Sequence, residues 1–273
     1  MSSQNPVFIP GPTNMPEEIR KAVFIPTIDH RSSVFAEILH PALRGVKEIL
    51  KSTSGEVFIF PSTGTGGWET ALTNTLSPGD KVLAARNGMF SQRWIDMCQR
   101  HGLDVEIVAA PWGTGIPVDR YEEILTSDKS HEITVVLATH NETATGVRSD
   151  IAAVRRALDA AGHPALLYVD GVSSIASMDF RMDEWGVDIA VAGSQKGFML
   201  PVGLAIVGFS PRAMAALETA TLPRTFFDVR DMAKGYAANG YPYTPAVGLL
   251  QGLQTSTGPL LDEGRGTVGS PHH

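Results

Sequence analysis

One cysteine, Cys98, occurs among the 273 residues, so the sequence cannot form an internal disulfide. The patterns CxxC and HExxH do not occur either, which argues against a structural zinc site and against a zinc peptidase. We therefore expect no metal centre. Cys98 lies in the helix-like segment WIDMCQRHG, residues 94–102, and we expect it to fill the core rather than to act as a nucleophile.

The sequence also lacks an excess of positive charge and any long apolar run. A formal net charge of −7 and the absence of a basic tract argue against nucleic acid or an anionic membrane as a partner. No run approaches the roughly 18 apolar residues of a membrane span, and MSSQNPVFIPGPTNMP does not resemble a signal peptide. We expect a cytoplasmic protein, and 43% hydrophobic residues suffice for a large core in one or two domains.

Short apolar runs alternate with helical patterns from residue 57 onward. The seven candidate strands are residues 57–60, 81–85, 105–109, 133–138, 165–169, 188–192 and 204–209. Their continuous apolar character is typical of strands that are covered on both faces, which predicts an α/β fold with a mostly parallel sheet. The last two runs are separated by only about a dozen residues, too few for a crossover helix, so we expect the last strand to be antiparallel.

Prolines, apolar spacing and capping residues predict the structure of the remaining segments. Four prolines between residues 6 and 16 predict an extended arm, over residues 1–20, that lies across the rest of the chain. Apolar residues between Phe35 and Lys51 recur at steps of three and four, which predicts a helix that Pro41 kinks or divides. Ser149 or Asp150 can cap a later helix, which Gly162 is placed to end.

Two charged residues follow buried runs of the predicted sheet. Lys196 follows VDIAVAG, and Asp170 closes ALLYVD. Most lysines are exposed, but a partly desolvated lysine can lose its proton near neutral pH and attack a carbonyl. A reactive lysine and an aspartate that faces a pyridine nitrogen are the groups that pyridoxal phosphate requires.

Other polar or aromatic groups follow other predicted strands. The glycine-rich turn at residues 62–67 opens a helix and is a candidate phosphate cradle, although such turns also serve plain strand-to-helix packing. Glu69 stands where a dinucleotide fingerprint requires a glycine, which counts against NAD. Phe90 and the polar run 139–146 follow two further strands, and core packing and local turn bonding are their alternative explanations.

Seven motifs together resemble those of the class V pyridoxal-phosphate aminotransferases, especially the serine–, alanine– and aspartate–glyoxylate branch. The resemblance covers about residues 5–253 and implies the large domain of PLP fold type I, from residue 21 to 253. The motifs are PGPTN at 10–14, STGTGGWE at 62–69, NGMFSQR at 87–93, THNETATG at 139–146, VDGVSSI at 169–175, GSQKG at 193–197 and YPYTPA at 241–246.

The resemblance implies a role for each matching residue. Lys196 would hold the cofactor as a Schiff base and move a proton at the substrate's α-carbon, while Asp170 would keep the pyridine nitrogen protonated. Phe90 would stack on the ring, and Thr143 would bond near the phenolic oxygen. Gly11 would lie over the substrate. The phosphate would be bound by Gly64, Thr65, Gly66 and Gln195, and by Tyr241 and Thr244 of the other subunit of a homodimer.

The last twenty residues differ from the family pattern. Residues 254–273 are rich in glycine and proline, which disfavour a helix, so we expect an atypical tail after a truncation or reading-frame change near residue 255. The family's C-terminal small domain, with the arginine that clamps the substrate carboxylate, would then be missing. Arg31 is a candidate replacement, although an exposed structural arginine is the favoured interpretation.

The leading functional hypothesis is transamination from serine, alanine or aspartate to glyoxylate, giving glycine. A non-catalytic remnant that only binds pyridoxal phosphate is the alternative from another class. A cysteine desulfurase is less favoured, because Cys98 comes too early in the chain and Gln195 stands where that family has histidine. No GxSxG pattern supports a hydrolase.

Overall fold

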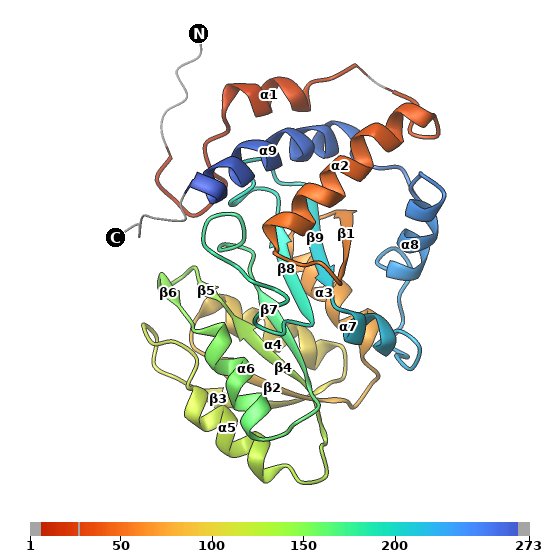
Figure 1. Cartoon of the computed structure of the whole chain (residues 1–273). Coiled ribbons are helices and arrows are strands. Elements are labelled where there is room, and N and C mark those ends of the chain that lie inside the picture. Colours follow the sequence, from red (N-terminus) through yellow and green to blue (C-terminus); the bar gives the residue numbers. More distant parts are fainter. Residues whose placement is uncertain (1–6, 27, 267–273) are drawn as a thin grey trace.

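The computed structural model of the chain describes residues 7–26 and 28–266, which form an α/β fold around one large sheet (Figure 1). Its strands are β1 Glu56–Pro61, β2 Lys81–Arg86, β3 Asp104–Ala109, β4 Ile133–Thr139, β7 Leu166–Asp170, β8 Ile189–Gly193 and β9 Leu204–Phe209. A separate ribbon consists of β5 Asn141–Glu142 and β6 Val147–Arg148. The helices are α1 Glu17–Val23, α2 Ser33–Ile49, α3 Gly64–Thr75, α4 Met89–Arg100, α5 Val118–Ser127, α6 Ile151–Ala160, α7 Pro211–Ala216, α8 Val229–Ala237 and α9 Val247–Gly266.

The large sheet has the strand order β1-β9-β8-β7-β4-β2-β3. The pairs β2–β3, β2–β4, β4–β7 and β7–β8 are parallel, and β9 is antiparallel to both of its neighbours. All seven predicted strands and the antiparallel last strand are therefore confirmed. The order also places the carboxyl ends of β8, β7, β4 and β2 next to one another, which is where open α/β sheets bind ligands.

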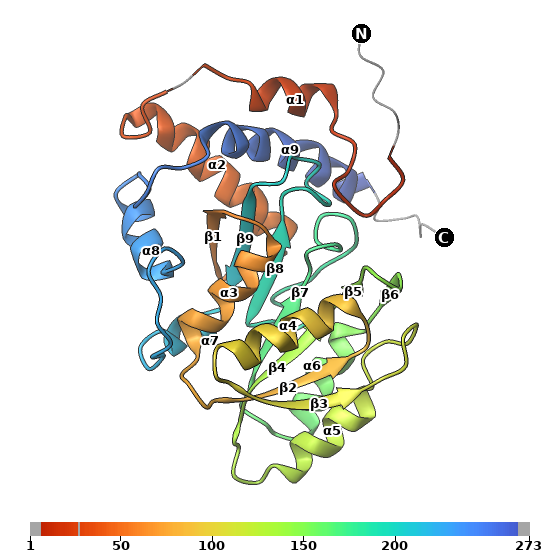
Figure 2. The ribbon, with the colours of Figure 1, turned by 180° about the vertical axis from the view of Figure 1, so that it is seen from behind.

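Helices cover both faces of the sheet. One face packs against α2, α5, α6 and α9, through side chains such as Phe35, Tyr121 and Val154. The other packs against α3, α4 and α8, through Trp68 and Trp94 among others, and Figure 2 shows α3 and α4 in front of the sheet and α8 beside its β1 edge. Both layers bury continuous apolar strands, as β9 shows with six buried residues of six. Cys98 is fully buried in the second layer, as expected.

The predicted helices are present, but Pro41 does not divide the first of them. Pro41 lies inside α2, which is a single helix, with Phe35, Ile38 and Val46 on its buried face. Asp150, not Ser149, caps α6, because its Oδ1 accepts a hydrogen bond of 2.9 Å from the N–H of Ala153. Gly162 follows that helix in the left-handed conformation, with φ of 60°.

Two expectations about the ends of the chain are corrected. The arm is extended only to Pro16, and α1 begins at Glu17, three residues before the expected limit of residue 20. A segment without proline and with two glutamates in its first turn is well suited to begin a helix there. Residues 254–266 continue α9, so the prediction that they are unsuited to a helix is wrong, and residues 267–273 lie outside the described residues.

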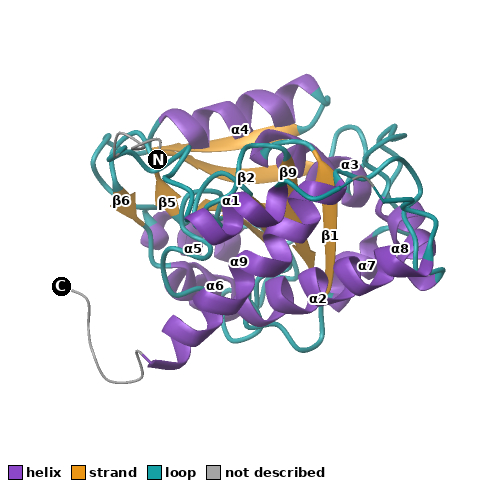
Figure 3. Ribbon diagram, turned by 90° about the horizontal axis from the view of Figure 1, so that it is seen from above, coloured by secondary structure: helices purple, strands orange, loops and turns teal. Residues whose placement is uncertain are grey.

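Tertiary packing explains why α9 tolerates its glycines and proline. The helix packs against α1 and α2 across one end of the molecule (Figure 3). Ser256 donates a buried hydrogen bond of 2.6 Å to the carbonyl of Phe198, and Thr257 contacts Gly45 of α2, which has no Cβ in the way. Gly258 also lacks the Cβ that would clash with the ring of Pro259 in helical geometry. No helix among residues 7–26 and 28–266 is both long and apolar enough to cross a membrane.

Contact between α9 and α1 depends on glycine at position 248. A Cβ added there would lie 2.5 Å from the carbonyl oxygen of Val23, a backbone atom that cannot turn aside. We expect Gly248→Ala to lower the free energy of unfolding by about 1–3 kcal/mol, despite the better helix propensity of alanine. Urea unfolding measures the change. Gly115→Ala is the control, because its nearest new contact would be 3.6 Å, and equal stability of the two variants would contradict the prediction.

Candidate active site

Lys196 lies three residues beyond the end of β8, in a tight turn that leads to β9. The Ser194 hydroxyl closes this turn by donating to the carbonyl of Pro201 at 2.7 Å and accepting from the N–H of Leu204 at 3.1 Å. The lysine side chain is partly buried, and burial lowers the pKa of its ammonium group against the opposing effect of Asp170. A larger share of the neutral amine, the nucleophilic form, follows at neutral pH.

Asp170 ends the neighbouring strand β7 and is 4% exposed. Burial raises the pKa of its carboxyl to about 7, while the N–H of Val172, which donates to Oδ1 at 2.9 Å, and the charge of Lys196 favour the carboxylate. The indole of Trp68 is near enough to act in the same direction, but its buried Nε1 forms no hydrogen bond with any described residue. Asp170 is therefore a buried carboxyl to which no cationic side chain of the described residues donates a hydrogen bond.

The N-terminal arm crosses the turn that carries Lys196. The N–H of Thr13 donates to the carbonyl of Gln195 at 3.1 Å, and the Thr13 hydroxyl donates to the carbonyl of Lys196 at 3.1 Å. At Gly11, an added Cβ would lie 2.4 Å from Cδ of Lys196, so only glycine allows this close approach. The arm lies across the rest of the chain as predicted, and it contacts Lys196 directly.

The predicted phosphate cradle opens α3. No side chain caps this helix N-terminus, so the N–H groups of its first turn, residues 64–66, are suited to an anion. The side chain of Val172 lies beside Gly64 at the start of α3. It also lies near Gly193, which ends β8 and is close to the Gln195 amide. The cradle, the end of β8 and the loop after Asp170 thus meet at one place. The buried Oε1 of Gln195 has no hydrogen-bond partner among the described residues.

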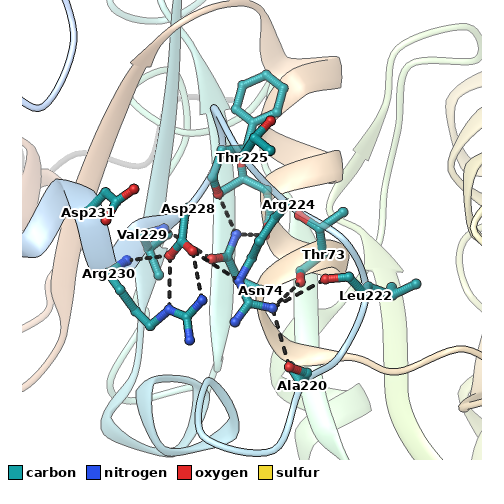
Figure 4. Close-up of polar contacts among 12 residues, drawn as sticks. Thr73, Asn74, Ala220, Leu222, Arg224, Thr225, Asp228, Val229, Arg230 and Asp231 are labelled. Carbon is teal, nitrogen blue, oxygen red and sulfur yellow. Dashed lines mark hydrogen bonds and ion pairs between the residues drawn. The ribbon is translucent and has the colours of Figure 1, made fainter.

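A polar cluster holds the far end of α3 in place (Figure 4). The Asn74 amide bridges the segment before α8, donating to the carbonyl of Phe227 at 2.6 Å and accepting from the N–H of Val229 at 3.0 Å. The Asp228 carboxylate accepts three hydrogen bonds from Arg230, one from its backbone N–H at 2.9 Å and two from its guanidinium at 3.1 and 2.8 Å. Arg224 donates to the carbonyls of Thr73, Ala220 and Leu222. Phe227 in turn contacts Gly66, so this cluster fixes one wall of the cradle.

Phe90 and Thr143 come from the ends of β2 and β4. Phe90 lies half-buried in the first turn of α4, with the guanidinium of Arg93 5.3 Å from its ring centre. The Thr143 hydroxyl donates to Oγ of Ser173 at 2.8 Å, which ties its loop to the loop after Asp170. The sequence predicted this polar loop but not the β5–β6 ribbon within it. Trp68, Glu142 and Ser173 are among the residues of the quoted motifs to which the sequence assigned no role.

The structure places Tyr241 and Thr244 apart from this group. The Tyr241 hydroxyl hydrogen-bonds to the carbonyl of Ile59, and burial raises its pKa. Both residues line a surface hollow of about 600 Å³, together with His30 and Arg31. This placement leaves them outside the site formed by Lys196 of the same chain.

The assembled residues fit pyridoxal phosphate. The uncapped start of α3 suits its phosphate, the buried Asp170 suits its ring nitrogen, and Lys196 suits its aldehyde. The buried Oε1 of Gln195, which accepts no hydrogen bond from the described residues, offers a further polar contact. Fold and site together define a pyridoxal-phosphate-type α/β domain.

The comparisons with known proteins agree with this class. A model of the family "Aminotransferase class-V" matches residues 20–247. The L-aspartate–glyoxylate aminotransferase of Paracoccus denitrificans is 78% identical over all of this chain and 69% of its own length. The serine–glyoxylate aminotransferase of Hyphomicrobium methylovorum is 54% identical over 97% of this chain and 66% of its own length. The crystal structure of an aspartate aminotransferase from Thermus thermophilus has a TM-score of 0.87 at 28% identity, covering 95% of this chain and 71% of that one.

The chain belongs to the class V aminotransferases, which confirms the resemblance found in the sequence. Membership implies pyridoxal phosphate as the cofactor and aminotransfer as the class of reaction. The chain spans about two thirds of the length of these curated relatives, 69% and 66% for the two named.

Asp170 should make the cofactor-free chain sensitive to pH. Its carboxyl pKa is about 7 in the folded chain and 3.8 in the reference state, so only the folded chain keeps this proton between these values. The free energy of unfolding therefore falls as pH rises from about 4 to about 7. At pH 8 we expect Asp170→Asn to stabilise the cofactor-free chain by roughly 2–4 kcal/mol.

Urea unfolding at pH 5 and pH 8 measures this difference. The buried carboxyl of Asp188 also has a raised pKa, but it is present in both proteins, so their comparison isolates Asp170. An identical pH dependence in the unchanged chain and in Asp170→Asn would show that Asp170 is ionised throughout.

Proposed function

We propose that this chain transfers the amino group of a small amino acid, aspartate, serine or alanine, to glyoxylate and so forms glycine. The observation that carries the proposal is the pair Lys196 and Asp170, on adjacent strand ends, whose pKa values burial moves in opposite directions. Aspartate is the donor that we favour, because the relative at 78% identity is an L-aspartate–glyoxylate aminotransferase.

Each residue has a role that its position supports. Bound pyridoxal phosphate supplies an electron sink for the substrate's α-carbon. Asp170 holds a proton at the pyridine nitrogen, and Lys196, in its neutral form, moves the proton at the α-carbon. Residues 64–66 and Gln195 bind the phosphate, Phe90 contacts the ring face, and Thr143 orients the ring. Gly11 keeps the arm close to Lys196 and excludes water from that side.

We further propose that the chain works as a homodimer, in which Tyr241 and Thr244 serve the partner's phosphate. Their position in a hollow whose lining includes neither Lys196 nor Asp170, and the apolar side chains exposed on the arm, such as Phe8 at 92%, support this arrangement. Arg31 lines the same hollow and stays a candidate for binding a substrate carboxylate. A cytoplasmic location and the absence of nucleic-acid and membrane partners stay predictions from composition.

A chain that binds the cofactor without turning over substrate is the second candidate. The observation in its favour is that the chain spans only 69% and 66% of two glyoxylate aminotransferases that it resembles. Desulfurase chemistry at Cys98 has no support, because that thiol is buried and its pKa is raised to about 12.

A donor screen on the purified chain distinguishes these candidates. With pyridoxal phosphate and glyoxylate present, we expect aspartate, serine or alanine to drive glycine formation, measured by chromatography of derivatised amino acids. Lys196→Ala should lower the rate by at least about 1,000-fold, because it removes the group that transfers the proton. Lys129→Ala, which removes an exposed lysine of the loop after α5, is the matched control and should keep full activity.

One pattern of results would contradict the proposed activity. Cofactor absorbance that is lost in Lys196→Ala, but that does not respond to any of the three donors, would identify a chain that only binds pyridoxal phosphate.

A further inference from the structure

The N-terminus of α4 has no cap of its own. Its first residue is Met89, and Gly88, which occupies the cap position, has no side chain. The Ser91 hydroxyl accepts from the N–H groups of Asn87 and Gly88, at 3.1 and 3.0 Å, and so does not serve the first turn of the helix. The N–H groups of Phe90 and Ser91 therefore require an acceptor from elsewhere in the fold.

Glu142 supplies that acceptor from the ribbon strand β5. Its side chain is fully buried, and its carboxylate accepts from the N–H of Phe90 at 3.1 and 3.2 Å and from the N–H of Ser91 at 3.0 Å. It also accepts from the N–H of Ala144 at 3.2 Å. A negative charge at a helix N-terminus is favoured by the helix dipole. The carboxylate thus takes the place of a cap side chain.

Gly88 leaves the space that Glu142 occupies. A Cβ added at Gly88 would lie 2.3 Å from Cγ and 2.4 Å from Cδ of the glutamate. A serine or aspartate at position 88 could cap the helix locally, without burying a charge that comes from another strand. Gly88 and Glu142 are therefore complementary, because the glycine leaves the space that the glutamate side chain fills. The need for a helix cap does not by itself explain this arrangement, since a residue at position 88 could supply the cap.

The contact between Glu142 and the first turn of α4 links residues that would contact the cofactor. Glu142 bonds to the backbone of Phe90 and directly precedes Thr143, whose hydroxyl reaches Ser173 near Asp170. We propose that Glu142 is a positioning residue, which holds the Phe90 ring and the Thr143 hydroxyl in register with Asp170. This inference rests on the proposed function, because it assigns these residues to one pyridoxal-phosphate site.

Two substitutions disturb the link in different ways. Glu142→Gln keeps the shape but removes the charge and turns one acceptor into a donor that faces backbone N–H groups. Gly88→Ala keeps the charge and pushes the carboxylate away, and the extended φ of 175° at this position accepts alanine without backbone strain. Glu122→Gln, at an exposed position of α5, is the matched control for loss of one charge.

Cofactor binding and the geometry of the bound ring are measured separately. Equilibrium dialysis with pyridoxal phosphate gives the dissociation constant, and visible circular dichroism at saturation gives the signal per bound cofactor. We expect both site variants to weaken binding by at least about tenfold and to change the signal per bound cofactor. Glu122→Gln should match the unchanged chain in both measurements.

The results separate this inference from the proposed function. A helix cap that only stabilises the fold would lower the melting temperature but leave the dichroism per bound cofactor unchanged, and that result would overturn the inference. Unchanged affinity in both variants would overturn it as well. If the unchanged chain bound no pyridoxal phosphate, the proposed function itself would fail, and the inference with it.

Discussion

Burial acts on Asp170 and Lys196 in opposite directions, and the site depends on this contrast. Asp170 ends β7 and is buried, and Lys196 follows the end of the adjacent parallel strand β8 and is partly buried. Desolvation disfavours the charged form of each group, so the acid keeps its proton more readily and the amine loses its proton more readily. A pyridinium nitrogen beside Asp170 would restore the missing counter-charge. Because its ionised form is disfavoured by burial, Asp170 is the group that the proposed function assigns to the pyridine nitrogen.

The loops around Asp170 and Lys196 form hydrogen bonds with one another. The Ser173 hydroxyl accepts from Asn141 and Thr143, both at 2.8 Å, and so joins the loops after β4 and β7. Beside it, Nδ1 of His140 lies 2.9 Å from Oγ of Ser174. Burial lowers the pKa of His140 to about 4, which keeps this imidazole neutral at physiological pH. The charges of two ionisable groups act on the pKa of Asp170 in opposite directions, since Glu142 raises it and Lys196 lowers it.

Sequence patterns predicted the fold, and the position of Asp170 and Lys196 after neighbouring strands, because burial leaves a direct trace in the residues. Strands covered on both faces read as continuous apolar runs, and a charge at the end of such a run, as at Asp170 and Lys196, is rare enough to be informative. The helical conformation of residues 254–266 could not be predicted in the same way. It depends on contacts with Phe198 and Gly45, which are distant in sequence, and such contacts override local propensity.

The role of Glu142 shows what a sequence pattern does not contain. A glutamate between Asn141 and Thr143 in a polar run has the appearance of a loop residue, and Gly88 has the appearance of an ordinary turn. Only the parallel pairing of β2 with β4 brings the loop after one strand beside the helix that follows the other. Glu142 and Gly88, which leaves the space for its side chain, lie more than fifty positions apart in the sequence. Neither residue has a function in this contact without the other. Side chains that position others are therefore harder to predict than those that react, because their chemistry depends on a distant neighbour.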